Sequence, residues 1–188
     1  MRLRWLAEVL KLEATRLVFV DESGFRLNLT PTYAYAPSGE RAYGSVPKNR
    51  GENTSLLAAL SLDEGVCAAM TLTGAVDGAA FEVYVQEVLC PKLRAGQVVV
   101  LDRLNVHKNR QVREAILAKG CTLLFLPGYS PDLNPIELAF SKLKTWVRQV
   151  EARTRQALDD AIAAALKTIT LQDVIGWFGN AGYNHHSF

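Results

Sequence analysis

Three acidic residues border apolar segments of the chain, where a carboxylate is costly unless it is paired or binds a cation. Asp21 ends the run RLVFVD, Asp102 ends QVVVLD, and Glu137 opens the amphipathic run after LPGYSPDLNP. Carboxylates that lie close together repel one another, and a divalent cation reverses this repulsion. Oxygen ligands suit Mg²⁺, and two such ions about 3.5–4 Å apart stabilise both the attacking and the leaving oxygen of a phosphoryl transfer. The residue types therefore predict a site for metal-dependent phosphoryl transfer.

Apolar periodicity predicts the elements that must bring these acids together. Runs of β-forming residues predict three strands, over 16–23, 97–104 and 121–127. Residues 54–74 predict a further pair of strands around the turn DEG. Helical spacing predicts five helices, over 2–12, 77–93, 108–120, 135–150 and 154–169. Strands that flank a helix form a parallel βαβ unit. We therefore predict an α/β fold with a mixed five-stranded sheet and helices on both faces, in which ligands gather at the carboxyl ends of strands.

Two of the acids have alternative interpretations. Glu22 competes with Asp21, but neighbouring strand residues face opposite sides, so only one of them can face the site, and we favour Asp21. Glu137 also fits the third position of a helix that Asn134 caps and Pro135 begins, as in a capping box. A cap and a metal ligand are competing uses of this side chain, so we expect Asn134 to cap the helix without its help.

The composition indicates an ordinary globular domain. The chain has 188 residues, of which 49% are apolar and 21% charged, with a formal net charge of +2. The three cysteines fit no zinc or disulfide pattern, which favours a reduced, cytoplasmic setting. The N-terminus lacks the apolar stretch of a signal peptide, and no uncharged apolar run reaches the roughly 18 residues of a membrane span.

Three motifs occur in order along the chain: VFVDESG, VVVLDRLNVHK and LPGYSPDLNPIE, with 34 residues between Asp102 and Glu137. Together they resemble the catalytic domain of DDE-type transposases, in the mariner-like bacterial insertion-sequence branch of the ribonuclease-H-like superfamily. The resemblance implies a ribonuclease-H-like fold in which Asp21, Asp102 and Glu137 bind Mg²⁺ or Mn²⁺, as two ions. It implies an endonuclease that cleaves double-stranded DNA at transposon ends and joins the ends to target DNA, as a homodimer associated with the bacterial nucleoid.

The chain departs from the family pattern at two positions and in one larger respect. Arg103 stands where the family usually has asparagine, and Gly128 where it often has proline. Relatives carry helix-turn-helix modules before the catalytic domain, whereas here about 15 residues precede the first strand. We therefore expect residues 1–15 to be a short helix or remnant linker and 16–188 the catalytic domain. The DNA-reading module is then expected on a separate or fused chain.

Several further residues are candidates for contact with DNA. His107 is a helix-entry residue or a contact to the scissile phosphate or attacking water. Lys144 and Arg148 share one helix face, which is solvated or touches phosphates leading out of the site. The long irregular stretch 24–53 is a flexible loop or a clamp on DNA or a partner. The candidate DNA contacts are Arg41, Lys48, Arg50, Arg103, Lys108, Lys144 and Arg148.

Two alternatives to a transposase stay open at this point. One is a two-metal nuclease of the same fold that cuts without strand transfer, and the other is an inactive remnant that only binds DNA or a partner. Arg103 and the absent end-reading modules favour the remnant, while the retention of all three acids opposes it.

Overall fold

The computed structural model describes residues 2–103 and 109–183, which form a five-stranded sheet in the order β3-β2-β1-β4-β5. The central strand β1 (Leu17–Phe25) pairs antiparallel with β2 (Thr54–Ser61) and parallel with β4 (Val98–Leu101). The outer strands are β3 (Gly65–Thr73), antiparallel to β2, and β5 (Thr122–Phe125), parallel to β4. The predicted mixed sheet, the hairpin around DEG and the parallel βαβ unit are confirmed.

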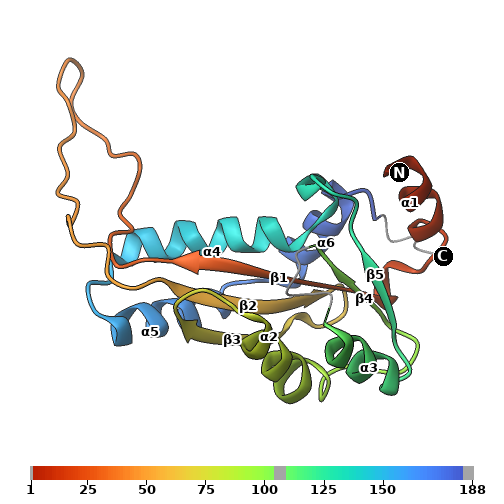
Figure 1. Cartoon of the computed structure of the whole chain (residues 1–188). Helices are drawn as coiled ribbons and strands as arrows, with labels where there is room; N and C mark the ends of the chain where they lie inside the picture. The colour runs from red at the N-terminus through yellow and green to blue at the C-terminus, as the bar shows by residue number, and fades with distance from the viewer. Residues whose placement is uncertain (1, 104–108, 184–188) are drawn as a thin grey trace.

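The sheet separates two hydrophobic cores (Figure 1). Alternate residues of β1 point to opposite faces, so Phe19 and Phe25 join one core while Val18 and Val20 join the other. The first core is covered by four helices, α1 (Arg2–Val9), α4 (Ile136–Val150), α5 (Arg155–Leu166) and α6 (Leu171–Asn180). We call this side of the sheet the α4 face.

The opposite face is covered by the helical segment that follows β3 and by the helix between β4 and β5. The first of these is the predicted helix 77–93, which is α2 (Gly78–Val83) continued by a π-helical stretch, Tyr84–Leu89. The second is α3 (Arg110–Ala118), which Asn109 caps and after which Gly120 takes a φ of +71°. That positive φ is the left-handed conformation which glycine adopts at helix ends.

One helix, α6, is absent from the predicted set. It begins at a capping box in which Thr170 accepts from the Asp173 N–H and the Asp173 carboxylate accepts from the Thr170 N–H. Val174 and Phe178, one turn apart, bury its inner side in the core of the α4 face. Within the described residues no single helix is long and apolar enough to span a membrane; only α5 and α6 together reach that length and composition, and they meet at 82°.

Residues 26–53 form an irregular arm that projects far from the body (Figure 1). We call this segment the arm. Its root is fixed, because the Leu27 N–H donates to the Arg50 carbonyl and the Arg153 guanidinium donates to the carbonyls of Leu27 and Leu29, at 3.1 Å each. Farther out, the tyrosines are almost fully exposed: Tyr33, Tyr35 and Tyr43. The predicted long irregular segment is thus present, with an anchored base and an exposed, aromatic outer part.

Candidate active site

Asp21 lies within β1, and Asp102 is the first residue after the neighbouring parallel strand β4. The β1–β4 register pairs Phe19 with Val100, and each aspartate stands two residues farther along its strand direction. Adjacent strands lie about 4.8 Å apart, so the backbones that carry the two acids are neighbours. Phe19 and Val100 both belong to the core of the α4 face, and the strand period of two places Asp21 on that face as well. Asp102 directly follows the last residue of β4. Glu22 has the opposite parity, as the choice of Asp21 over Glu22 requires.

Asp21 is held in one orientation although it lies within the sheet. It is 7% exposed, and each of its carboxylate oxygens accepts a hydrogen bond. Oδ1 accepts from the Glu22 N–H at 2.7 Å, and Oδ2 accepts from the side-chain amide of Asn134 at 2.8 Å. These two donors fix the orientation of the carboxylate.

The expectation that Asn134 caps α4 is wrong. The residue that precedes the helix is Pro135, and no side chain among the described residues caps its first turn. The Asn134 amide is turned toward Asp21 instead, 113 positions earlier in the chain. Only the Asn134 backbone carbonyl serves the helix, accepting from the Glu137 N–H at 3.2 Å. The capping box that competed for Glu137 is therefore not formed.

Glu137 is exposed and lies in the first turn of α4, the helix that packs along β1 (Figure 1). The helix N-terminus favours a negative charge there. In the part of the chain that the structure describes, no group of three or more His, Cys, Asp or Glu side chains lies close enough to hold a metal ion. The structure thus places Asp21 within β1, Asp102 just after β4 and Glu137 in the first turn of α4, without closing the three into a ligand set among the described residues.

The residues nevertheless suit a hard divalent cation in their chemistry. All three candidate ligands are carboxylates, which are the donors that Mg²⁺ and Mn²⁺ prefer. One further oxygen, Asn134 Oδ1, is buried and has no hydrogen-bond partner among the described residues. A buried oxygen beside a carboxylate indicates a place for a donor that the described residues do not supply.

The loop that leads into α4 is supported from behind by both ends of the described chain. The Tyr183 hydroxyl donates to the Leu133 carbonyl at 2.7 Å, and both residues are buried. Burial raises the pKa of Tyr183, so the hydroxyl keeps its proton and remains a donor. From α1, Trp5 packs edge-on against Tyr183, and Arg2 forms an ion pair with Asp132, whose pKa it lowers.

Arg103, the departure from the family pattern, is tied to the neighbouring strand. Its Nε donates to the Leu126 carbonyl at 3.1 Å, just beyond the end of β5. This bond links the segment after Asp102 to the start of the loop that carries Asn134. Its exposed side chain remains at the edge where the two aspartates stand.

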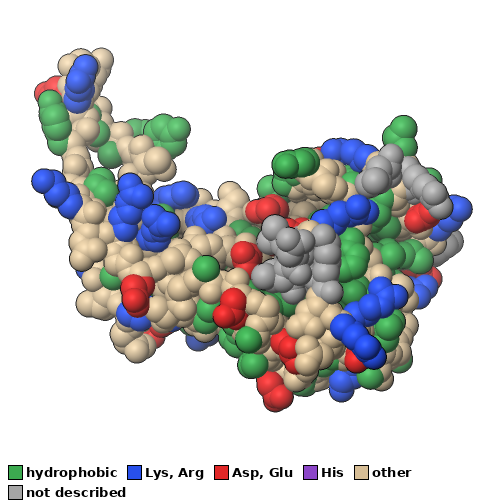
Figure 2. Space-filling view, viewed as in Figure 1, with side chains coloured by type: hydrophobic (Ala, Val, Ile, Leu, Met, Phe, Trp, Pro, Cys, Tyr) green, Lys and Arg blue, Asp and Glu red, His purple; other side chains and the backbone are tan. Residues whose placement is uncertain are grey.

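Basic residues gather where β1 passes into the arm (Figure 2). Lys144 on α4 lies over the ring of Phe25, the last residue of β1, with its ammonium 6.0 Å from the ring centre. Arg50 pairs through its backbone with Leu27 at the arm root, and Arg148 follows Lys144 by one turn of the same helix. Arg41 and Lys48 lie farther out and are exposed.

Two predicted site residues, His107 and Lys108, lie outside the described residues. Asn134 was predicted only as a helix cap, and Tyr183 and Arg153 were not singled out. Each makes contacts with residues far away in the sequence, for which a single sequence carries no direct signal.

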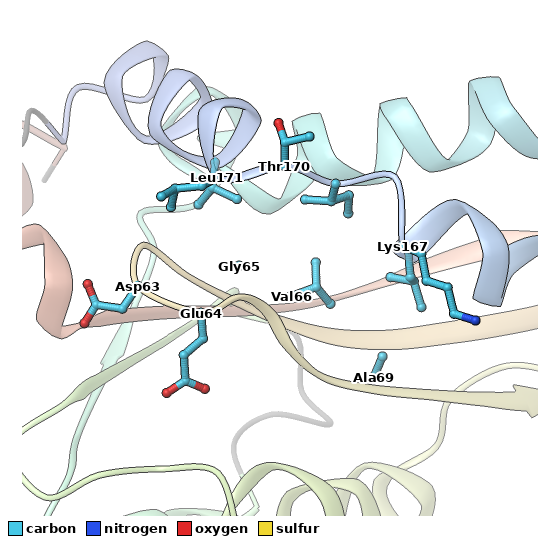
Figure 3. A pocket seen from close by; sticks show the side chains of 11 residues that line it. Asp63, Glu64, Gly65, Val66, Ala69, Lys167, Thr170 and Leu171 are labelled. Carbon is cyan, nitrogen blue, oxygen red and sulfur yellow. The ribbon is translucent and has the colours of Figure 1, made fainter.

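A pocket lies elsewhere, between the β2–β3 turn and the connection from α5 to α6 (Figure 3). Its lining runs from Asp63 at one end to Lys167 at the other and includes the apolar side chains of Val66 and Leu171. None of the three candidate metal ligands lines it. The pocket is therefore separate from the carboxylate site.

Comparisons with solved structures show similar folds. The chain is similar to the Mos1 strand transfer complex, with a TM-score of 0.72 and 19% identity over 96% of this chain and 55% of that one. It is similar to a pre-cleavage Mos1 transpososome, with a TM-score of 0.71 and 17% identity over 99% of this chain and 60% of that one. The catalytic domain of Mos1 mariner transposase matches with a TM-score of 0.62 and 16% identity, over 96% and 82% of the two chains. This chain therefore spans little more than half of the longer Mos1 chains.

The fold likeness confirms the predicted ribonuclease-H-like architecture, in which a mixed five-stranded sheet carries helices on both faces. No curated protein matches the chain. A family model, described as DDE superfamily endonuclease, matches residues 16–159, which is most of the chain and includes all three candidate ligands. The chain belongs to the DDE superfamily endonucleases.

Proposed function

We propose that this chain is the catalytic domain of a transposase, which cleaves DNA at transposon ends and joins those ends to target DNA. The observation that carries the proposal is the placement of three acids in a chain of the DDE family. Asp21 lies on β1, Asp102 follows the strand that pairs in parallel with β1, and Glu137 stands in the first turn of α4. The fold likeness to the Mos1 strand transfer complex supports strand joining as well as cleavage.

Asp21, Asp102 and Glu137 are the residues that would hold the metal, as two ions of Mg²⁺ or Mn²⁺. Mos1 paired end complexes exist with Mn and with Mg. The bound ions would supply charge stabilisation to the attacking and leaving oxygens of the phosphate. The chain's own part is to fix the ligands: Asp21 is oriented by two hydrogen bonds, and Glu137 extends from the first turn of a helix whose other side is packed in the core.

The side chains of Asp21 and Glu137 also differ in how firmly they are held, which suits a site that closes on its substrate. Asp21 is buried and held at both oxygens, whereas Glu137 is exposed. On this proposal the exposed Glu137 side chain turns toward the other two acids when metal and DNA bind. Arg103, bonded to the Leu126 carbonyl, then has its charge available for a DNA phosphate at the same edge.

The DNA path proposed here leads from the carboxylates along α4 to the arm. Lys144, Arg148 and Arg50 would contact phosphates near the end of β1, and Arg41 and Lys48 would extend the contact along the arm. Lys108 and His107 follow Asp102 in the sequence and belong to the same proposal.

The proposed partner is double-stranded DNA, and the proposed active form is a homodimer. A helix-turn-helix module, fused or on a separate chain, would read the transposon ends. The division into residues 1–15 and 16–188, and a cytoplasmic place on bacterial DNA, belong to the same proposal.

Strand joining on pre-cut DNA separates this function from the nuclease and the inactive alternatives. The assay supplies a labelled duplex with a free 3′-hydroxyl end and a plasmid target, with Mg²⁺ or Mn²⁺, and compares wild type with Asp102→Asn. If the chain is a transposase, wild type joins the label to the plasmid and Asp102→Asn does not. Nicking of the plasmid without joined product would identify a nuclease, and binding without either reaction would identify a remnant.

A further inference from the structure

Asn134 joins the elements that carry two of the three candidate ligands. Its side-chain amide donates to Asp21 Oδ2 at 2.8 Å, and its backbone carbonyl accepts from the Glu137 N–H at 3.2 Å. A carboxylate oxygen is only an acceptor here, so the nitrogen of the amide must face Asp21 and the orientation of the amide is determined. Asn134 thus fixes both the Asp21 side chain on β1 and the start of α4, the helix that carries Glu137.

The remaining atom of this amide, Oδ1, is buried and has no hydrogen-bond partner among the described residues. Asn134 as a whole is 5% exposed. Buried amide oxygens are almost always hydrogen-bonded, because their desolvation is otherwise uncompensated. The same amide donates to Asp21, so Oδ1 lies in the immediate surroundings of that carboxylate.

The backbone of Asn134 is fixed from its other side. Its N–H donates to the Pro131 carbonyl at 3.0 Å, and the preceding carbonyl, of Leu133, accepts the Tyr183 hydroxyl. The amide is thus held on a supported loop, which is what orienting another side chain requires.

We propose that Asn134 is a positioning residue for the metal site, with a separate task for each end of its amide. Nδ2 holds Asp21 in its ligand orientation, and Oδ1 accepts a hydrogen bond from a water molecule bound to the metal ion. This role rests on the proposed function, because it requires that Asp21 bind a divalent cation. It adds to that function a fourth residue, which acts on the metal through Asp21 and through a bound water.

The test measures Mn²⁺ affinity, which does not depend on DNA or turnover. Wild type, Asn134→Ala and Asn134→Ser are titrated with Mn²⁺, and free ion is followed by electron paramagnetic resonance. Loss of a residue that orients a metal ligand typically weakens metal binding by about 10–100-fold, and we expect both variants in that range. Serine keeps a polar group in the space but cannot reach Asp21, which gives a second variant should alanine impair folding. Thermal melts without metal report whether each variant is folded.

Tyr183→Phe is the matched control, because it removes one buried hydrogen bond to the same loop without touching Asp21. We expect it to lower the melting temperature and to leave Mn²⁺ affinity within about twofold of wild type. Wild-type Mn²⁺ affinity in both Asn134 variants would overturn the proposal. An equal loss of Mn²⁺ affinity in Tyr183→Phe would also overturn it, because the effect would then come from a loosened loop. If wild type itself shows no saturable Mn²⁺ binding, the metal site fails and this role fails with it. Saturable wild-type binding with unaffected Asn134 variants would remove the role of Asn134 alone.

Discussion

Removal of the Arg153 guanidinium should release the root of the arm without unfolding the domain. Arg153 donates from one nitrogen to the carbonyls of Leu27 and Leu29, at 3.1 Å each. Hydrogen bonds to charged groups contribute about 1.5–3 kcal/mol when buried, and partial exposure of this side chain lowers that figure. We expect Arg153→Ala to lower the free energy of local opening by about 1–2 kcal/mol, which corresponds to a factor of about 5–30 in the opening equilibrium.

The Leu27 amide is the probe for this change, because its N–H donates to the Arg50 carbonyl across the root of the arm. Its hydrogen exchange should accelerate about 5–30-fold in Arg153→Ala, while amides of β1 keep their protection. Arg155→Ala is the control, since Arg155 bonds Asp159 on its own helix and Thr73 rather than the arm. Unchanged exchange at Leu27 in Arg153→Ala, or equal acceleration in both variants, would refute this account of the anchored arm.

Three further predictions concern charge and buried hydrogen bonds. Lys144→Ala should weaken DNA binding and lower the slope of log affinity against log salt by about 0.9, the contribution of one phosphate contact; an unchanged slope in a salt titration would show that Lys144 contacts solvent only. Hydrogen bonds from Lys142 and Thr170 lower the pKa of Asp173 to about 2, so its stabilising effect is complete above about pH 4 and is lost as the pH falls toward 2. Denaturant unfolding at pH 5 and pH 2.5 should show that wild type loses more stability than Asp173→Asn over this range, and equal losses would contradict the assignment. Tyr183→Phe should lower the free energy of unfolding by about 1–3 kcal/mol, because a buried carbonyl loses its donor; no change in urea unfolding would show that another donor replaces the hydroxyl.

The inner strands β1, β2 and β4 were predictable because most of their residues are buried, on both faces of the sheet. Every residue of β2 and β4 is buried, and such strands appear in the sequence as continuous apolar or small-residue runs. Helix α6 escaped prediction because Gly176 and Gly179 weaken its propensity, although the TLQD capping box at 170–173 was a readable start signal. The π-helical stretch after α2 has no comparable signal, since helical spacing alone does not distinguish it from an α-helix.

The candidate acids Asp21, Asp102 and Glu137 could be chosen from the sequence, and their role as metal ligands stays a prediction. Period-two alternation separates Asp21 from Glu22, and Asp102 follows the strand that pairs in parallel with β1. The use of Asn134 was not predictable, because a local cap and a contact to β1 fit the same residue and only packing decides between them. The supporting contacts of Tyr183 and Arg153 arise from packing as well.

The most direct test of the central claim is Mn²⁺-dependent nicking of supercoiled plasmid by wild type, Glu137→Gln and Glu151→Gln. Glutamine keeps the size of the side chain and removes the charge that a metal ligand needs. Glu151, which follows the C-terminal end of the same helix, bonds Arg153 and serves as the matched control. We predict that Glu137→Gln loses at least about 100-fold in nicking rate, since charge stabilisation by bound metal contributes several kcal/mol, while Glu151→Gln stays close to wild type. Equal nicking by all three proteins, each abolished by EDTA, would contradict the assignment of Glu137 to the metal site.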